Sequence, residues 1–145
     1  MAITVKRITL WRSEVENAPG VLARTLEPFA EAGANLGIVM GYGYPGNEHR
    51  AAVELYPVAG KKPIAAAQKV GLAATDIPVL QVEGDNKPGL GHAMARAMAD
   101  AGINLRFVMA QVIGKKYTAV FGFENDADAR RAAGLIKKAA AAKKR

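Results

Sequence analysis

An internal repeat constrains the fold of this chain more than any other feature of its sequence. Residues 16–21 (ENAPGV) return as residues 85–90 (DNKPGL), 69 positions later, since 85 − 16 = 69. The same shift relates residues 32–40 to residues 101–109. Two similar blocks in one register indicate an internal duplication. We therefore expect two units of about 70 residues, each so small that it needs the other to bury a full core.

Hydrophobic periodicity and turn residues predict one order of elements in both units, residues 1–74 and residues 75–145. In the first unit we expect a strand at 3–12, a helix at 21–32, strands at 35–42 and 50–58, a helix at 62–70 and a short strand at 72–74. In the second we expect a strand at 76–83, a helix at 88–101, strands at 104–113 and 116–124, and a basic C-terminal helix from Asp126 onward. No strand is predicted after that helix. The second unit therefore either lacks its last strand or has that edge covered by a neighbouring segment.

A βαββαβ unit is the ferredoxin-like sandwich, in which helices cover one face of an antiparallel sheet. The expected fold class is therefore α+β, with two ferredoxin-like units in tandem. Because this fold serves enzymes, RNA binders and regulatory modules alike, its function has to be inferred from the site.

The charge of the chain is concentrated at its C-terminal end. Seven of the 20 basic residues lie in residues 130–145, no acidic residue follows Asp128, and the other 13 basic residues balance the 13 acidic ones. The net charge of +7 therefore belongs to the final helix, where cations suit the helix dipole. There is no cysteine, and no apolar run approaches the roughly 18 residues that would span a membrane. We expect a soluble, cytoplasmic protein.

Both copies of the repeat carry the same motif between their first two strands. A strand is followed by Asp/Glu-Asn-x-Pro-Gly-Leu/Val, a helix, Ala-Gly-x-Asn-Leu and a second strand. This pattern resembles the ACT domain family of small-molecule regulatory modules. Over residues 5–138 the chain is most similar to stand-alone proteins that consist of two tandem ACT domains. The resemblance implies units paired side by side, an effector that is usually an amino acid at their interface, a homodimer, and a separate regulated enzyme or other protein.

Carried over residue by residue, the resemblance also implies two sets of ligand-binding residues. The first set is Asn17, Ala18, Pro19, Gly20, Val21, Asn35 and Leu36, and the second is Asn86, Lys87, Pro88, Gly89, Leu90, Asn104 and Leu105. His92 and Arg106 are possible additional contacts, which make the second loop more polar than the first. Free amides at a helix N-terminus suit a carboxylate, and glycine lets a ligand approach the backbone. The alternative is that the repeated residues only shape turns and helix caps.

Other functions have weaker support in the sequence. The chain has two histidines and no catalytic pattern tied to the repeat, so we expect no enzyme, no catalytic residue, no metal site and no cofactor. Residues 41–46 spell G-x-G-x-x-G, but a strand follows them where a dinucleotide-binding fingerprint opens a helix. The strands at 35–42 and 104–113 lack the aromatic pattern of RNA-binding ferredoxin-like domains. A protein- or RNA-interaction module that uses the basic final helix remains the alternative, with nucleic acid the less expected partner.

Overall fold

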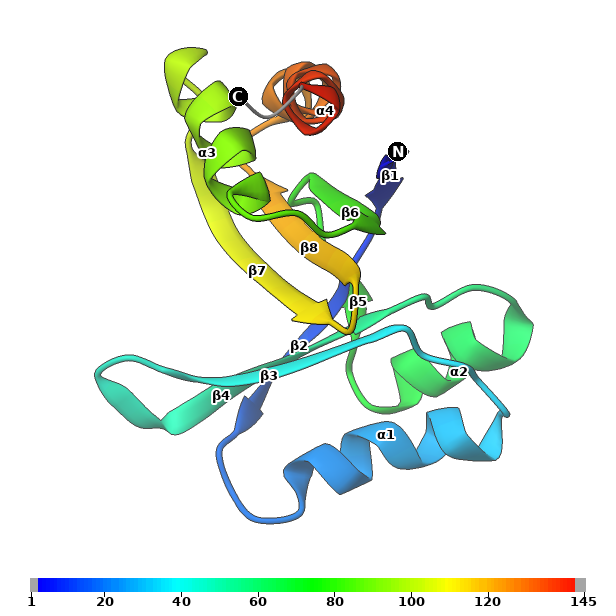
Figure 1. Cartoon of the computed structure of the whole chain (residues 1–145). Coiled ribbons are helices and arrows are strands. Elements are labelled where there is room, and N and C mark those ends of the chain that lie inside the picture. The colour runs from blue at the N-terminus through cyan, green and yellow to red at the C-terminus, as the bar shows by residue number, and fades with distance from the viewer. Residues whose placement is uncertain (1–2, 143–145) are drawn as a thin grey trace. The chain divides into compact units, whose positions relative to one another are not determined.

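The computed structural model describes residues 3–142 and separates into two units (Figure 1). The continuous unit is Thr9–Asp76. The split unit combines the first strand, β1 (Ile3–Ile8), with the residues from Ile77 onward. This grouping differs from the division after residue 74 that the repeat suggested, because β1 pairs with a strand of the other repeat.

The continuous unit is one four-stranded antiparallel sheet with two helices on one face (Figure 1). Its elements are β2 (Trp11–Glu16), α1 (Val21–Glu31), β3 (Ile38–Tyr44), β4 (Asn47–Tyr56), α2 (Lys61–Lys69) and β5 (Ala73–Ala74). The strand order is β3-β4-β2-β5. Phe29 from α1, Leu55 from β4 and Ala67 from α2 are buried together in its core.

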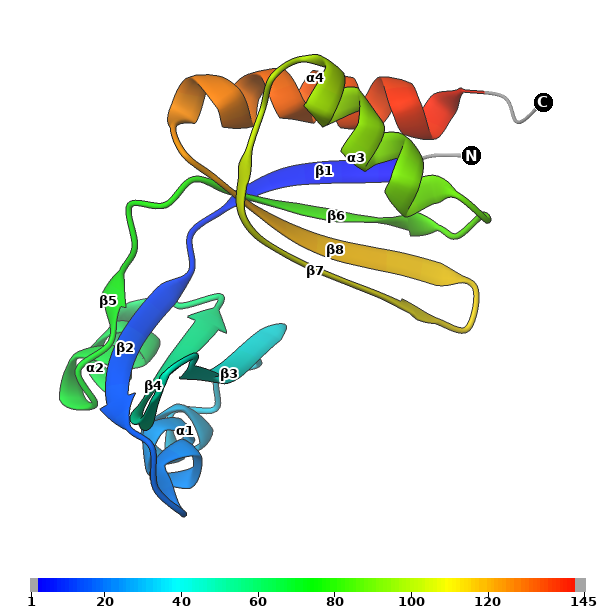
Figure 2. The same ribbon diagram turned by 90° about the vertical axis from the view of Figure 1, so that its left-hand side faces the viewer.

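The split unit repeats this architecture with strand order β1-β6-β8-β7. Its further elements are β6 (Val79–Asp85), α3 (Leu90–Asp100), β7 (Leu105–Ile113), β8 (Lys116–Phe123) and α4 (Asp126–Ala141). Figure 2 shows α3 and α4 on the same face of this sheet, and Met94, Phe123 and Ile136 are buried between the layers. Both units are therefore ferredoxin-like, as expected. Among residues 3–142, no helix is long and apolar enough to cross a membrane.

The N-terminal strand takes the edge position that the second repeat was expected to lack. β1 runs antiparallel to β6, with Ile3 opposite Gly84 and Ile8 opposite Val79. The continuous unit has β5 at the corresponding place beside β2. No strand follows α4 within the described residues; Lys143, Lys144 and Arg145 of the basic tail lie outside them.

The prediction of a single strand at residues 3–12 is wrong, because two separate strands lie in this stretch. The chain leaves β1 after Ile8 and starts β2 at Trp11, with the exposed Thr9 and the fully buried Leu10 between them. β2 then pairs with β4 and extends to Glu16. The two strands belong to different sheets, and this is why one apolar, β-branched stretch contains both.

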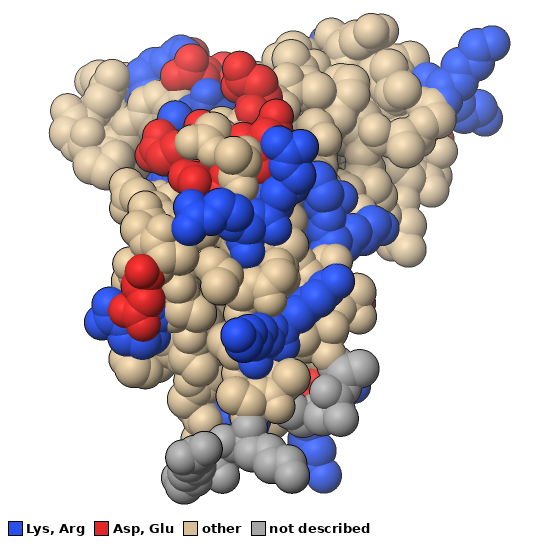
Figure 3. Space-filling model, turned by 90° about the horizontal axis from the view of Figure 1, so that it is seen from above, with Lys and Arg blue, Asp and Glu red and all other residues tan. Residues whose placement is uncertain are grey.

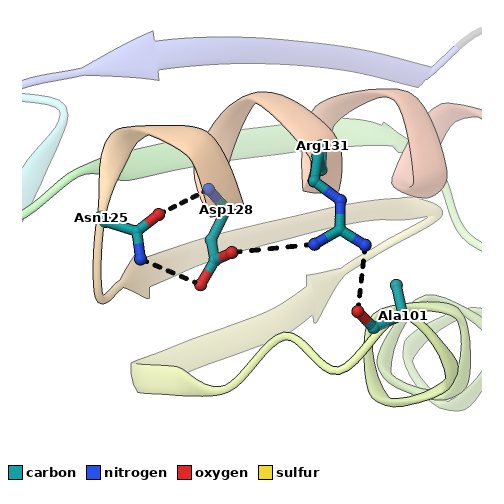
Figure 4. Close-up of polar contacts among 4 residues, drawn as sticks. All are labelled: Ala101, Asn125, Asp128 and Arg131. Atoms are coloured by element: carbon teal, nitrogen blue, oxygen red, sulfur yellow. Dashed lines mark hydrogen bonds and ion pairs between the residues drawn. The ribbon is translucent and has the colours of Figure 1, made fainter.

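The start of α4 is fastened to the end of α3 by a chain of polar contacts (Figure 4). Asn125 caps α4, because its Oδ1 accepts a 2.8 Å hydrogen bond from the backbone N–H of Asp128. The carboxylate of Asp128 lies 3.9 Å from Arg131. Arg131 in turn donates a 3.0 Å hydrogen bond to the carbonyl oxygen of Ala101, at the C-terminal end of α3. This chain of contacts joins the two helices above the sheet.

Candidate functional site

The two Pro-Gly loops have the same backbone geometry. Gly20 (φ 89°) and Gly89 (φ 83°) are in the left-handed region, directly before α1 and α3. In each loop a backbone N–H closes a turn, from Val21 to the oxygen of Ala18 and from Leu90 to the oxygen of Lys87, both at 3.2 Å. Among residues 3–142, no side chain caps either helix. Their first-turn amides are therefore suited to an anionic group such as a carboxylate.

The asparagine of each motif anchors its loop to the hairpin of its own unit. The backbone N–H of Asn17 donates to the carbonyl oxygen of His49 (2.9 Å), and its side-chain Nδ2 donates to that of Glu48 (3.0 Å). The backbone N–H of Asn86 donates to the carbonyl oxygen of Lys115 (2.8 Å). These bonds hold the start of each helix against the adjacent hairpin, so both asparagines position the loop.

A groove of about 270 Å³ lies beside the first of these loops, within the continuous unit. It is bounded by the end of β2, the first turn of α1 and the middle of the β3–β4 hairpin. The lining residues are Val15, Asn17, Val21, Leu22, Gly41, Tyr42, Gly43, Ala51, Ala52 and Val53. Two of the predicted site residues, Asn17 and Val21, therefore line this groove. The remaining walls are mostly aliphatic or glycine.

Other predicted residues of the first set lie away from this groove. Asn35 and Leu36 follow α1, whereas Asn17 precedes it, and an 11-residue helix is about 16 Å long. Asn35 is exposed in the loop before β3, which begins at Ile38, and Leu36 packs against the core. Within one unit these residues and the Pro-Gly loop cannot contact one small ligand, so a shared site would require a second unit.

In the split unit, the half-buried Lys87 forms hydrogen bonds to backbone carbonyl groups. Its Nζ donates to the carbonyl oxygens of Ala140 (2.8 Å) and Ala142 (3.0 Å), at the C-terminal end of α4. Asn104 is exposed before β7, and the half-buried Leu105 packs against the core. Of the second set, Lys87 and Leu105 therefore make contacts within the fold, whereas Asn104 is exposed.

The two possible additional contacts lie on the surface of the split unit. His92 is exposed on α3. Arg106 is half-exposed on β7, and its Nη1 lies 3.8 Å from a carboxylate oxygen of Glu124. Neither residue lines the groove of the continuous unit.

A polar cluster on β2, β3 and β4 was not predicted from the sequence. Tyr44 donates a 2.6 Å hydrogen bond to the carboxylate of Glu14 and accepts one of 2.5 Å from Arg12. Tyr42 donates a 2.8 Å hydrogen bond to Glu54, which is buried. The bond to Glu14 raises the pKa of Tyr44 and lowers that of the carboxyl group. The alternation of polar and apolar residues along β2 could have suggested a polar face. Which residues of β3 and β4 contact that face follows only from the register of the strands.

Comparison with known proteins supports the fold. The sequence matches no protein-family model and no curated protein. A protein from Bacteroides thetaiotaomicron has a similar structure, with a TM-score of 0.71, 16% identity, and coverage of 88% of this chain and 87% of that one. The ligand-free regulatory subunit of aspartate kinase from Thermus thermophilus gives a TM-score of 0.64 at 18% identity, covering 94% and 95%. The corresponding regulatory subunit from Thermus flavus gives 0.58 at 16% identity, covering 96% and 97%. This chain therefore has the fold of those regulatory subunits, which is ACT-like.

Proposed function

We propose that this protein is a regulatory module that binds an amino acid in the groove of the continuous unit. The observation that carries the proposal is the position of that groove beside the first turn of α1, whose amides are capped by no side chain of the described part of the chain. A ligand carboxylate would accept hydrogen bonds from these amides and gain from the positive end of the helix dipole. The ligand's apolar part would contact Val15, Leu22 and Val53.

The chemical character of the groove favours binding over catalysis. Of the described residues that line it, Tyr42 carries the one ionisable side chain. A hydrolytic or transfer reaction would need a nucleophile, a general base or an electrophile at the site. We therefore propose an effector-binding role without a catalytic step.

Regulation requires that the amino acid bind two arrangements of the protein with different affinities. The edge strands offer a means of changing arrangement, because β3 and β7 each lie at the end of their sheet. Val39 on β3 and Val108 on β7 are 45% and 55% exposed. Pairing of such edges between two copies would cover these side chains and extend the sheets. We propose a homodimer of this kind, which acts on a separate target protein.

A thermal-unfolding screen against the 20 L-amino acids tests this function. A selective ligand present at 100 times its dissociation constant should stabilise the protein by about 2.7 kcal/mol. The matched control is the amine that lacks the carboxylate of the best ligand, and it should give no shift. If no amino acid stabilises the protein, or if the amine works equally well, the proposal is wrong.

A second candidate function rests on the exposed basic face of α4. Arg130, Lys137 and Lys138 are exposed, and α4 has no acidic residue after Asp128. Figure 3 shows several groups of exposed Lys and Arg side chains in this view, while many of the acidic side chains visible there lie in one cluster. Such a face suits an acidic protein segment or RNA. Binding of a labelled polyanion that weakens steeply with salt, and is lost when all three residues are changed to alanine, would favour this role.

A further inference from the structure

The two units differ at the position of the groove. In the continuous unit Val15 pairs with Ala51, and in the split unit Gly84 pairs with Tyr117. Val15 and Gly84 are related by the repeat, since 84 − 15 = 69. Tyr117 therefore occupies in the split unit the place that Ala51 occupies in the continuous unit. The exchange of alanine for tyrosine therefore falls on a residue that lines the groove.

The side chain of Tyr117 points into the core of the split unit. It is 6% exposed and belongs to the core cluster that includes Leu90, the first residue of α3. Its phenol oxygen lies 3.6 Å from the position that a Cβ atom on Gly91 would take. Gly91 is the repeat partner of Leu22, since 91 − 22 = 69. The ring thus reaches the first turn of α3, where a leucine side chain would compete with it for space.

A second pair of lining positions changes in the same direction. Gly43 pairs with Ala51 across the β3–β4 hairpin, and Val112 pairs with Tyr117 across the β7–β8 hairpin. Gly43 and Val112 are also separated by 69 residues, since 112 − 43 = 69. Two small residues that open the groove in the continuous unit are therefore replaced by two larger ones in the split unit.

We infer that the side chain of Tyr117 fills the position in the split unit that corresponds to the groove of the continuous unit. Each chain therefore binds one amino acid, and it does so in the continuous unit. This inference rests on the proposed function and specifies it further. Because Val15, Leu22 and Val53 line the open groove, the ligand is an amino acid with an aliphatic side chain.

Isothermal titration calorimetry of the full chain with L-valine, L-leucine and L-isoleucine tests the inference. The wild-type protein should bind one of them with a stoichiometry of one per chain. Ala51→Tyr, which introduces the split unit's residue, should abolish binding. Gly43→Val should weaken binding by at least about tenfold, because the added side chain narrows the groove. Val112→Gly, the reverse exchange in the split unit, is the matched control and should bind as the wild type does.

Gly43→Val keeps the test informative if Ala51→Tyr fails to fold. Gly43 does not have a positive φ, and a Cβ atom there would meet its nearest neighbour, Nδ2 of Asn17, at an ordinary 3.7 Å. Two ligands per wild-type chain, or unchanged affinity in a folded Gly43→Val variant, would overturn the inference while leaving the proposed function in place. Binding of L-aspartate or L-lysine in preference to the aliphatic amino acids would overturn the ligand class. If none of the 20 amino acids binds, the proposed function itself fails.

Discussion

The Nζ atom of Lys87 donates a 2.8 Å hydrogen bond to the carbonyl oxygen of Ala140, which ties the loop before α3 to the last turn of α4. A cation at this end of a helix satisfies carbonyl groups that have no partner within the helix, and it also suits the helix dipole. The residue that the repeat places in a candidate ligand loop therefore stabilises the C-terminal helix.

Lys87→Met should lower the free energy of unfolding by about 0.3–1 kcal/mol, because the helix end loses its charged partner. Hydrogen exchange should quicken at the backbone amides of the last turn of α4. Urea denaturation and amide exchange measure the two effects. Lys137→Met, which removes an exposed charge from α4, is the control. Equal exchange rates in Lys87→Met and the wild type would show that the hydrogen bond contributes nothing.

Gly89→Ala should destabilise the protein through backbone strain alone. Gly89 has φ 83°, and no atom of the residues that the structure describes lies within 4 Å of the position that its Cβ would take, so we expect no steric overlap. The left-handed conformation costs a residue with a side chain about 1–2 kcal/mol. Gly91→Ala is the matched control: Gly91 has no positive φ and lies within α3, where alanine is the better helix former. The urea midpoint of unfolding should be lower than that of the wild type for Gly89→Ala, and equal to or higher than that of the wild type for Gly91→Ala. If the midpoint of Gly89→Ala is no lower than that of Gly91→Ala, backbone strain does not explain the role of Gly89.

The order of the elements could be read from the sequence because the repeat, the Pro-Gly turns and the glycines that end helices are local signals. Gly33 (φ 69°), for example, has the left-handed conformation that is typical of a glycine at the end of a helix. The division of residues 3–12 could not be read in this way. No glycine or proline marks the change at Thr9, and the residues of β6 that pair with β1 lie 71 to 81 positions further along the chain, since 79 − 8 = 71 and 84 − 3 = 81. Strand pairing over such a distance depends on the whole sheet.

The candidate site was predictable to a similar extent. The motif located the loops that begin α1 and α3, since their turn chemistry is local. The groove also needs Gly43 and Ala51, which come together through the register of the β3–β4 hairpin. That register shifts between Gly43 and Tyr44, and a sequence pattern does not show where such a shift falls. The role inferred for Tyr117 also depends on strand pairing, because Tyr117 lies opposite Val112 in the β7–β8 hairpin and opposite Gly84 of β6.

Deleting residues 1–8 should destabilise the split unit selectively. Ile8 is buried, and burial of one such side chain contributes about 1.5–3 kcal/mol. The deletion would also leave β6 as an unpaired edge, which favours aggregation. The single tryptophan, Trp11, lies in β2 and reports on the continuous unit, whose core cluster is its own.

Urea unfolding of the deletion variant should therefore show an early transition by circular dichroism and a later one by Trp11 fluorescence. Thr4→Ala, a change at an exposed position of β1, serves as the control and should behave as the wild type does. A single coincident transition in the deletion variant, unchanged from that of the wild type, would mean that β1 adds no stability to the split unit.

Tyr117 should make the stability of the protein sensitive to alkaline pH. Burial raises the pKa of its phenol above the ordinary value of 10.0. A group whose pKa is higher in the folded state contributes stability that is complete below the unfolded-state pKa, and this contribution is lost as the pH rises through the folded-state value. The free energy of unfolding should therefore fall more steeply above about pH 10 in the wild type than in Tyr117→Phe. Tyr42 and Tyr44, whose pKa values are also raised, are present in both proteins and cancel in the difference. Urea denaturation at a series of pH values measures how the free energy of unfolding of each protein depends on pH. If the wild type and Tyr117→Phe show the same dependence, the Tyr117 hydroxyl is exposed to water and does not fill the inferred position.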